Sequence, residues 1–151
     1  MGDIVILVSH RGNLRGKQAH NENNPDYIHH ALTKGYAVEV DVWYTDGFYL
    51  GHDYPHYQIS VNFLKTHNLW CHAKNLKAVS EMTKHSDIHY FWHQQDDITL
   101  TSKGYILCKP NVHPLNGSIS ILPEINNFNI QNCAGICSDN IESYYERCKT
   151  T

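Results

Sequence analysis

Glu39 and Asp41 are separated by one valine, in an apolar stretch with the composition of a β-strand. Side chains two positions apart on a strand point to the same face, so the two carboxylates share one face and Val38, Val40 and Val42 share the other. Neighbouring carboxylates repel each other unless a cation lies between them, and oxygen ligands of this kind suit Mg²⁺ or Ca²⁺. A solvated strand face is the alternative that this spacing leaves open.

A histidine is predicted to lie beside this carboxylate pair. Asp46 and Gly47 are typical of a two-residue hairpin turn. With these two residues as the turn, Asp41 pairs with His52, and paired Cβ atoms lie about 5 Å apart. A bulge would change this register and leave His52 as a surface residue in a loop.

Further polar residues end two other predicted strands. The tripeptide His10-Arg11-Gly12 follows the first apolar run, and His72 precedes Lys74 at the end of the third predicted strand. The planar fork of arginine suits phosphate, and lysine provides a point charge for it. His72 could bind a metal ion or be a packed, hydrogen-bonded histidine, and the sequence leaves both open.

The elements that must position these residues alternate between strand and helix. Helices are predicted after the capping residues Asn24, Asn75 and Asn140, and a short helix is predicted over residues 60–65. Strands are predicted at residues 4–8, 36–44, 48–50, 69–72, 89–92, 105–108, 119–122 and 133–137. This order predicts an α/β fold with a mainly parallel sheet, whose sites lie where strands end and helices begin.

Size and composition indicate one domain covering residues 1–151. The net charge is -3 and Lys and Arg form no run, so we expect no nucleic-acid partner. The first apolar run is too short for a membrane span, so we expect no integral membrane segment. The five cysteines include no CxxC pair, which favours a reducing, cytoplasmic location over a disulfide framework.

The motifs together resemble one enzyme family. HRG after the first strand, the Glu-x-Asp pair on the second, the following Asp-Gly, and Gly51-His52-Asp53 are similar to motifs of the glycerophosphodiester phosphodiesterases. Glu22-Asn23 resembles that family's glutamate–asparagine element. The resemblance is specific over residues 4–53, fair to residue 74 and weak beyond it. The sphingomyelinase D-type phospholipases share the same site plan.

This resemblance implies a (β/α)8 TIM-type barrel that hydrolyses a small glycerophosphodiester-like substrate with a divalent metal ion. The family's acid and base histidines correspond to His10 and His52, and its metal-binding carboxylates to Glu39 and Asp41. Full barrels run to about 250 residues, and residues 94–132 carry no good helix signal. We therefore expect an abridged barrel in which several helices are reduced to loops.

The third strand departs from the family's pattern. Where the family has an acidic residue two positions before a lysine, this chain has His72 before Lys74. We expect Arg11 and Lys74 to bind the phosphate and His72 to join the metal ligands. Imidazole shifts the preference from Mg²⁺ or Ca²⁺ toward Mn²⁺ or Zn²⁺. Glu124, from a later strand, is the alternative residue that could complete the site.

Three other functions stay open. One is a phospholipase D-like enzyme that acts on lipid head groups, and another is an inactive module that binds phosphate or sugar. The third is a transition-metal binder, since the chain contains 12 histidines. Trp92, His93, Asp96 and Asp97 are weaker candidates for lining the pocket. The leaving alcohol and the oligomeric state are not predicted.

Overall fold

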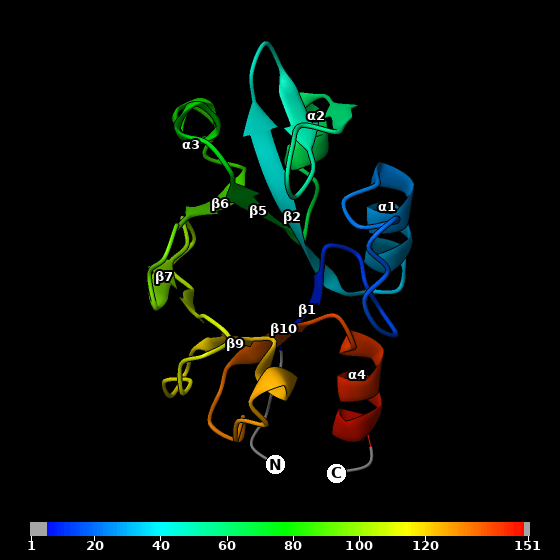
Figure 1. The fold of residues 1–151 in the computed structure, drawn as a ribbon, viewed down its shortest axis with the longest axis vertical. Helices are drawn as coiled ribbons and strands as arrows, with labels where there is room; N and C mark the ends of the chain where they lie inside the picture. The colour runs from blue at the N-terminus through cyan, green and yellow to red at the C-terminus, as the bar shows by residue number, and fades with distance from the viewer. Residues whose placement is uncertain (1–5, 150–151) are drawn as a thin grey trace.

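The computed structural model of this protein describes residues 6–149, so positions 4 and 5 of the first predicted strand lie outside the described residues. Figure 1 shows the strands arranged around a ring, with helices on part of its outside. In chain order the elements are β1 (Ile6–His10), α1 (Pro25–Thr33), β2 (Ala37–Tyr44), β3 (Phe48–Leu50), β4 (Tyr57–Ile59), α2 (Val61–Leu64), β5 (Leu69–Ala73), α3 (Leu76–Met82), β6 (His89–Trp92), β7 (Ile98–Leu100), β8 (Ile106–Cys108), β9 (Ile119–Ile121), η1 (Pro123–Ile125), β10 (Gly135–Ser138) and α4 (Ile141–Lys149).

The ten strands form one mainly parallel sheet, which confirms the α/β class. The ladder runs without a break through β6, β5, β2, β1, β10, β9, β8 and β7, while β3 and β4 extend from β2 as an antiparallel arm. Among the described residues no ladder joins β6 to β7. Two hydrogen bonds cross this opening: Ser102 N–H donates to the Tyr90 carbonyl at 2.8 Å, and Tyr90 N–H donates to Ser102 Oγ at 2.9 Å.

Helices α1, α3 and α4 begin directly after the predicted capping residues Asn24, Asn75 and Asn140, and the short helix predicted over residues 60–65 is α2. Asn24 accepts a hydrogen bond from the Asp26 N–H, Ser60 from the Phe63 N–H and Asn75 from the Ala78 N–H. Each bond satisfies a backbone donor that the first helical turn leaves unpaired.

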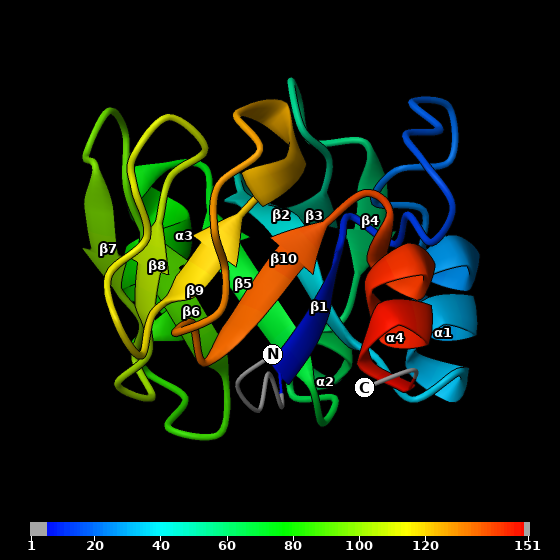
Figure 2. The same cartoon turned by 90° about the horizontal axis from the view of Figure 1, so that it is seen from below.

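The helices cover only part of the ring. Figure 2 shows α1 and α4 side by side outside β1 and β10. The one helix in residues 94–132 is the short 3₁₀ helix η1, in agreement with the absence of helix signals there. No helix in residues 6–149 is long and apolar enough to cross a membrane.

Two apolar cores lie on opposite faces of the sheet. Val38, Val40 and Val42 pack in the outer core, which includes Ile28 and Ala31 of α1. The inner core, within the ring of strands, is formed by Val8, Trp70, Phe91, Leu107, Ile119 and Cys137. Because strand side chains alternate between faces, the carboxylates of Glu39 and Asp41 on β2 point away from the outer core and into the ring.

Some sequence predictions for these elements are wrong. The short strands β4 and β7 were not predicted. The apolar side chain of Leu76 in α3 is 73% exposed, whereas Ala78 and Met82 are buried. Ala78 and Met82 are four residues apart and so share the face that meets the sheet, and Leu76 falls on the opposite side of the helix.

Candidate active site

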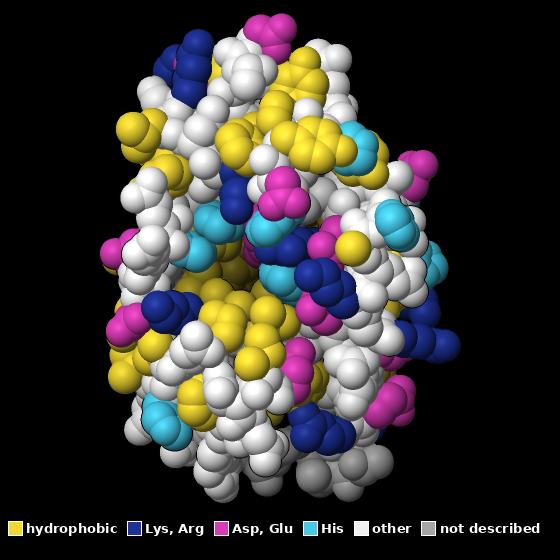
Figure 3. Space-filling view, viewed as in Figure 1, with side chains coloured by type: hydrophobic (Ala, Val, Ile, Leu, Met, Phe, Trp, Pro, Cys, Tyr) yellow, Lys and Arg dark blue, Asp and Glu magenta, His cyan; other side chains and the backbone are white. Residues whose placement is uncertain are grey.

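A buried cluster of two carboxylates and an imidazole lies inside the ring. Glu39 and Asp41 on β2 and His72 on β5 each offer a ligand atom, and these atoms all lie within 4.8 Å of one another. The parallel pairing of β2 with β5 sets Asp41 opposite His72. Figure 3 shows histidines gathered with acidic and basic side chains around a hollow on this face. The predicted same-face placement of Glu39 and Asp41 is confirmed.

Asp41 is completely buried and well provided with partners. Its side chain accepts a hydrogen bond from Asn23 Nδ2 at 2.9 Å and lies 3.0 Å from Arg11 Nε and 3.2 Å from His72 Nδ1. Burial by itself would raise the pKa of Asp41, but the hydrogen bond from His72 and the charge of Arg11 hold it well below its usual value. Asp41 is therefore ionised and fixed in place.

Glu39 has the opposite environment. Its Oε2 atom is buried without a hydrogen-bond partner, 3.8 Å from His10 Nε2, and its Oε1 atom lies 3.9 Å from His72 Nδ1. Burial raises the pKa of Glu39, and the charge of Asp41 raises it further. A buried carboxylate oxygen without a donor, beside a second carboxylate and an imidazole, is a donor set that fits a divalent cation.

His10 is held by an aspartate that the sequence analysis did not identify. His10 Nδ1–H donates to Asp139 Oδ1 at 2.7 Å, and Asn13 Nδ2 donates to the same oxygen at 2.9 Å. Burial lowers the pKa of His10, but the bond to Asp139 and the charge of Glu39 outweigh it and raise the pKa. Asp139 directly follows β10, so the strand-end rule applied to the predicted strand at 133–137 could have identified it.

Arg11 lies between two carboxylates. Its Nε is 3.0 Å from Asp41 and its Nη1 is 3.3 Å from Glu22, while its backbone has a left-handed φ of 59°. Gly12 follows with a φ of 92°, and a Cβ there would lie 2.6 Å from the Tyr27 ring. The glycine of the HRG tripeptide is thus required by both backbone conformation and close packing.

The predicted pairing of His52 with Asp41 is wrong. The observed pairs Tyr44–Phe48 and Val42–Leu50 leave a three-residue loop, one residue longer than predicted. Neither Asp46 nor Gly47 has a positive φ, so the loop is not the type I′ turn on which the prediction relied.

His52 consequently lies at the rim of the site. Its side chain is 44% exposed, and its Nδ1 is 2.8 Å from Asp53. It still faces the site, because it lines a hollow of about 330 Å³ together with Arg11, His72 and Lys74. Burial and the charge of Arg11 lower the pKa of His52.

Two of the weaker candidates line the same hollow. Trp92 and His93 do so, whereas Asp97 pairs with Lys109 at 2.9 Å and Asp96 is outside the lining. The His93 ring stacks on the His72 ring with centroids 4.3 Å apart and planes 7° apart. Burial and the charge of His72 lower the pKa of His93 to about 4, so this stacked ring is neutral near pH 7.

Glu124 does not join the carboxylate cluster. Its two oxygens accept hydrogen bonds from Ser138 Oγ at 2.7 Å and Tyr144 OH at 3.0 Å. It lines a separate hollow with Asn140 and Arg147. The geometry therefore favours His72 over Glu124 as the third residue of the cluster.

Fold and site together describe an α/β protein with a carboxylate–imidazole cluster inside a ring of strands, at the strands' carboxyl ends. No family model, curated protein or solved structure matches the chain.

Proposed function

We propose that this protein is a metal-dependent phosphodiesterase of the glycerophosphodiester phosphodiesterase type. One observation carries the proposal: the unpartnered Glu39 oxygen lies 3.8 Å from His10 Nε2, within the cluster formed with Asp41 and His72. A candidate cation site and an aspartate-bound histidine thus lie next to each other. Phosphodiester hydrolysis uses both, because charge must be neutralised and protons transferred.

The proposed architecture is a single-domain, abridged (β/α)8 barrel. In support, the strand ladder runs from β6 around to β7, and an apolar core fills the ring. The proposed site residues lie at the carboxyl ends of the strands, where such barrels place their sites. Over residues 94–132 loops stand where a full barrel has helices.

In this proposal Glu39, Asp41 and His72 hold the divalent metal, with Mn²⁺ or Zn²⁺ bound in preference to Mg²⁺ or Ca²⁺ because of the imidazole. When bound, the metal supplies positive charge to the phosphate oxygens. Arg11 and Lys74 bind the same anionic group. The charge of Arg11 is shared with its two carboxylate neighbours, whereas Lys74 forms no ion pair among the described residues.

The two histidines divide the proton transfers. His10 has a raised pKa and Asp139 fixes its ring, so it is the general acid that protonates the leaving oxygen from Nε2. His52 has a lowered pKa and is the general base that takes a proton from the attacking water or substrate hydroxyl. Neighbouring groups whose environments move their pKa values apart are typical of acid–base pairs. Asp139 is a positioning residue.

One observation favours a second candidate, an inactive module that binds phosphate. His52 is 44% exposed and paired with Asp53 instead of standing opposite Asp41. Binding a phosphate requires Arg11 and Lys74 but no acid–base pair. The two candidates therefore differ in turnover and agree in affinity for phosphate.

The test is hydrolysis of bis-p-nitrophenyl phosphate, glycerophosphodiesters and a lysophospholipid, with EDTA and then with excess Mn²⁺. We expect EDTA to stop hydrolysis and Mn²⁺ to restore it. His10→Ala should lose most turnover and keep metal affinity, and Glu39→Gln should lose both. His29→Ala is the matched control, because His29 is an exposed histidine on α1.

Each arm has an outcome that contradicts the proposal. Hydrolysis that continues in EDTA would refute the metal site. Phosphate binding without turnover in the presence of every metal would establish the binding module instead. Cleavage of the lysophospholipid but of no glycerophosphodiester would indicate a lipid head-group enzyme.

A further inference from the structure

A second hollow, of about 380 Å³, lies at the opposite mouth of the ring. It is lined by residues at the beginnings of strands, among them Ile6 of β1, Ala37 of β2, Leu69 of β5 and His89 of β6. The proposed active site lies at the other ends of these strands, and the inner core separates the two. The hollow is within the size range of small-molecule sites, roughly 300 to 1,000 Å³.

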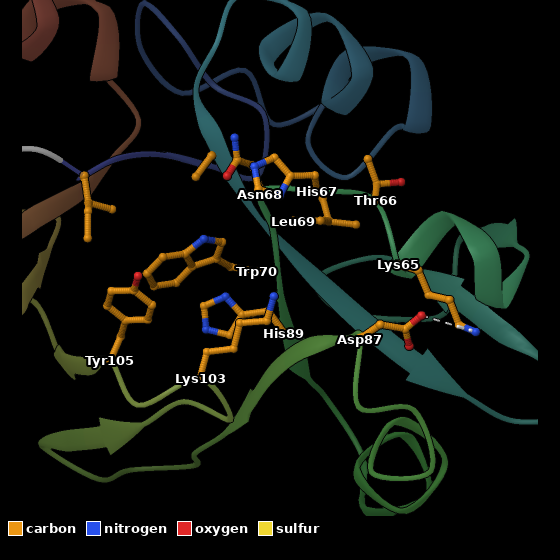
Figure 4. Close-up of a pocket in the computed structure, with 12 residues that line it drawn as sticks. Lys65, Thr66, His67, Asn68, Leu69, Trp70, Asp87, His89, Lys103 and Tyr105 are labelled. Atoms are coloured by element: carbon orange, nitrogen blue, oxygen red, sulfur yellow. Dashed lines mark ion pairs between the residues drawn. The ribbon is translucent and has the colours of Figure 1, made fainter.

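Three rings form one wall of this hollow, as Figure 4 shows. The Trp70 ring centroid lies 4.3 Å from that of His89 and 4.9 Å from that of Tyr105. Trp70 and His89 are almost completely buried, but Tyr105 is 36% exposed. The wall therefore offers an accessible aromatic surface on a rigid base, against which a flat ring can stack.

Two polar groups on the same side lack partners within the protein. Trp70 is only 6% exposed, and its indole N–H has no hydrogen-bond partner in residues 6–149, although solvent can reach this atom. A buried tyrosine or tryptophan usually satisfies its polar atom. Lys103, which runs beside His89 in Figure 4, forms no ion pair in the same part of the chain. Both groups are donors that solvent or a ligand in the hollow can satisfy, since no acceptor of the described residues does so.

The charge of the lining favours an anion. Lys65 and Asp87, on the other side of the hollow, pair with each other at 3.6 Å. Burial and the charge of Lys103 lower the pKa of His89 to about 4, so His89 is neutral near pH 7. Its Nε2 is 2.8 Å from Thr101 Oγ1. The ammonium of Lys103 is thus the charge of the lining that is left without compensation.

We propose that this hollow binds a small planar anion, a ring compound that carries a carboxylate or a phosphate. The ring stacks on Tyr105, the anionic group pairs with Lys103, and the Trp70 N–H donates to an acceptor on the ligand. The inference does not depend on the proposed phosphodiesterase activity, because none of its residues belongs to that site.

The three tryptophans provide the measurement. In ¹H–¹⁵N spectra each gives one indole signal, and Trp70→Phe identifies that of Trp70. Trp43 is an internal reference, since its Nε1–H already donates to the Gly51 carbonyl at 2.7 Å. Trp92 lines the proposed active site and reports binding there. The probes are benzoate, AMP, adenosine and inorganic phosphate.

We expect benzoate, AMP or both to shift the Trp70 signal, and adenosine and phosphate to shift it much less. The difference between benzoate and AMP identifies which anionic group the hollow takes. Lys103→Ala should weaken binding roughly tenfold or more, because a charge-assisted bond is lost. Lys103→Arg should keep most of the affinity, and Lys84→Ala, which changes an exposed lysine on another surface, should keep all of it.

Binding by His10→Ala distinguishes this site from the proposed active site, because that variant should still bind the probe at Trp70. The proposal is overturned if neither benzoate nor AMP shifts the Trp70 signal at millimolar concentration. It is also overturned if the Trp92 signal moves instead, or if a folded Lys103→Ala protein binds like the parent.

Discussion

Replacing Glu39 with glutamine should stabilise the protein in the absence of metal while removing its metal affinity. The two carboxylates have ligand atoms within 4.8 Å of each other, and one Glu39 oxygen has no donor. Two unit charges 4.8 Å apart repel by about 3 kcal/mol at an effective dielectric constant of about 20. His10 and Arg11 offset part of this repulsion, so we expect Glu39→Gln to raise the free energy of unfolding by about 1–2 kcal/mol.

The pH dependence of this gain has a definite sign. The pKa of Glu39 is raised in the folded protein, compared with about 4.3 in an unfolded chain. Below pH of about 4 both states carry the proton, and the substitution should change little. As pH rises from the unfolded pKa to the folded pKa, the parent loses stability, because Glu39 ionises more readily in the unfolded chain than in the folded protein. The stability advantage of the variant should therefore grow between these two pKa values and become constant above the folded one.

Asp41→Asn is the matched control, since it changes the other carboxylate of the same cluster. Asp41 has close contacts with Asn23, His72 and Arg11, and its pKa is lowered. Its replacement should cost about 2–4 kcal/mol, because charge-assisted contacts are lost and Arg11 is left without its nearest carboxylate. The two neutral substitutions, two residues apart, should thus have opposite effects.

The assay is urea unfolding, followed by far-UV circular dichroism, in EDTA between pH 5 and pH 8.5. With Mn²⁺ at 100 times its Kd the parent should gain about 2.7 kcal/mol and the Glu39→Gln variant almost none, which reverses their order. A metal-free Glu39→Gln protein that is less stable than the parent throughout this range would refute the reasoning. Glu39 would then be paired in the native state, and the site would not need a cation.

Three other perturbations test the remaining parts of the site and fold. Asp139→Asn should lower the pH of the limb that reports His10 in the pH–rate profile, because Asp139 no longer offsets the effect of burial on the His10 pKa. A limb that does not move would exclude the His10–Asp139 pair from catalysis. His72→Glu should shift metal preference from Mn²⁺ toward Mg²⁺ in calorimetric titrations, whereas Glu124→Ala should leave metal affinity unchanged, and the reverse result would assign the site to Glu124. Ile28→Ala, at a completely buried position in α1, should lower the free energy of unfolding by about 2–5 kcal/mol in urea melts. A change within about 0.5 kcal/mol, typical of surface sites, would contradict the packing of α1 in the outer core.

Local signals in the sequence predicted the helices and most of the strands. Helix starts depend on a side chain that bonds a backbone N–H two or three residues away, so Asn24 and Asn75 could be identified without knowledge of the fold. The alternation of side chains along a strand is equally local. For that reason the shared face of Glu39 and Asp41 followed from their spacing alone.

The hairpin register shows where local reasoning was insufficient. Asp-Gly favours a two-residue turn, but the observed loop includes Thr45 as well, which shifts every pair by one residue. A shift by one moves His52 from its expected place opposite Asp41 to the rim of the site. The register of β3 is fixed on its other side by β4, whose pairing with it involves residues outside the turn.

What the sequence by itself determined were the types of the site residues and their places at the ends of strands: His10 and Arg11 after one strand, the carboxylates on the next, and His72 before Lys74 on a third. Only the tertiary structure decided which of these residues meet. Asp139 reaches His10 across 129 positions of sequence, because β10 and β1 are neighbours in the sheet. Which strands become neighbours in the sheet depends on how the whole chain packs around its two apolar cores. No pattern within a single strand encodes this.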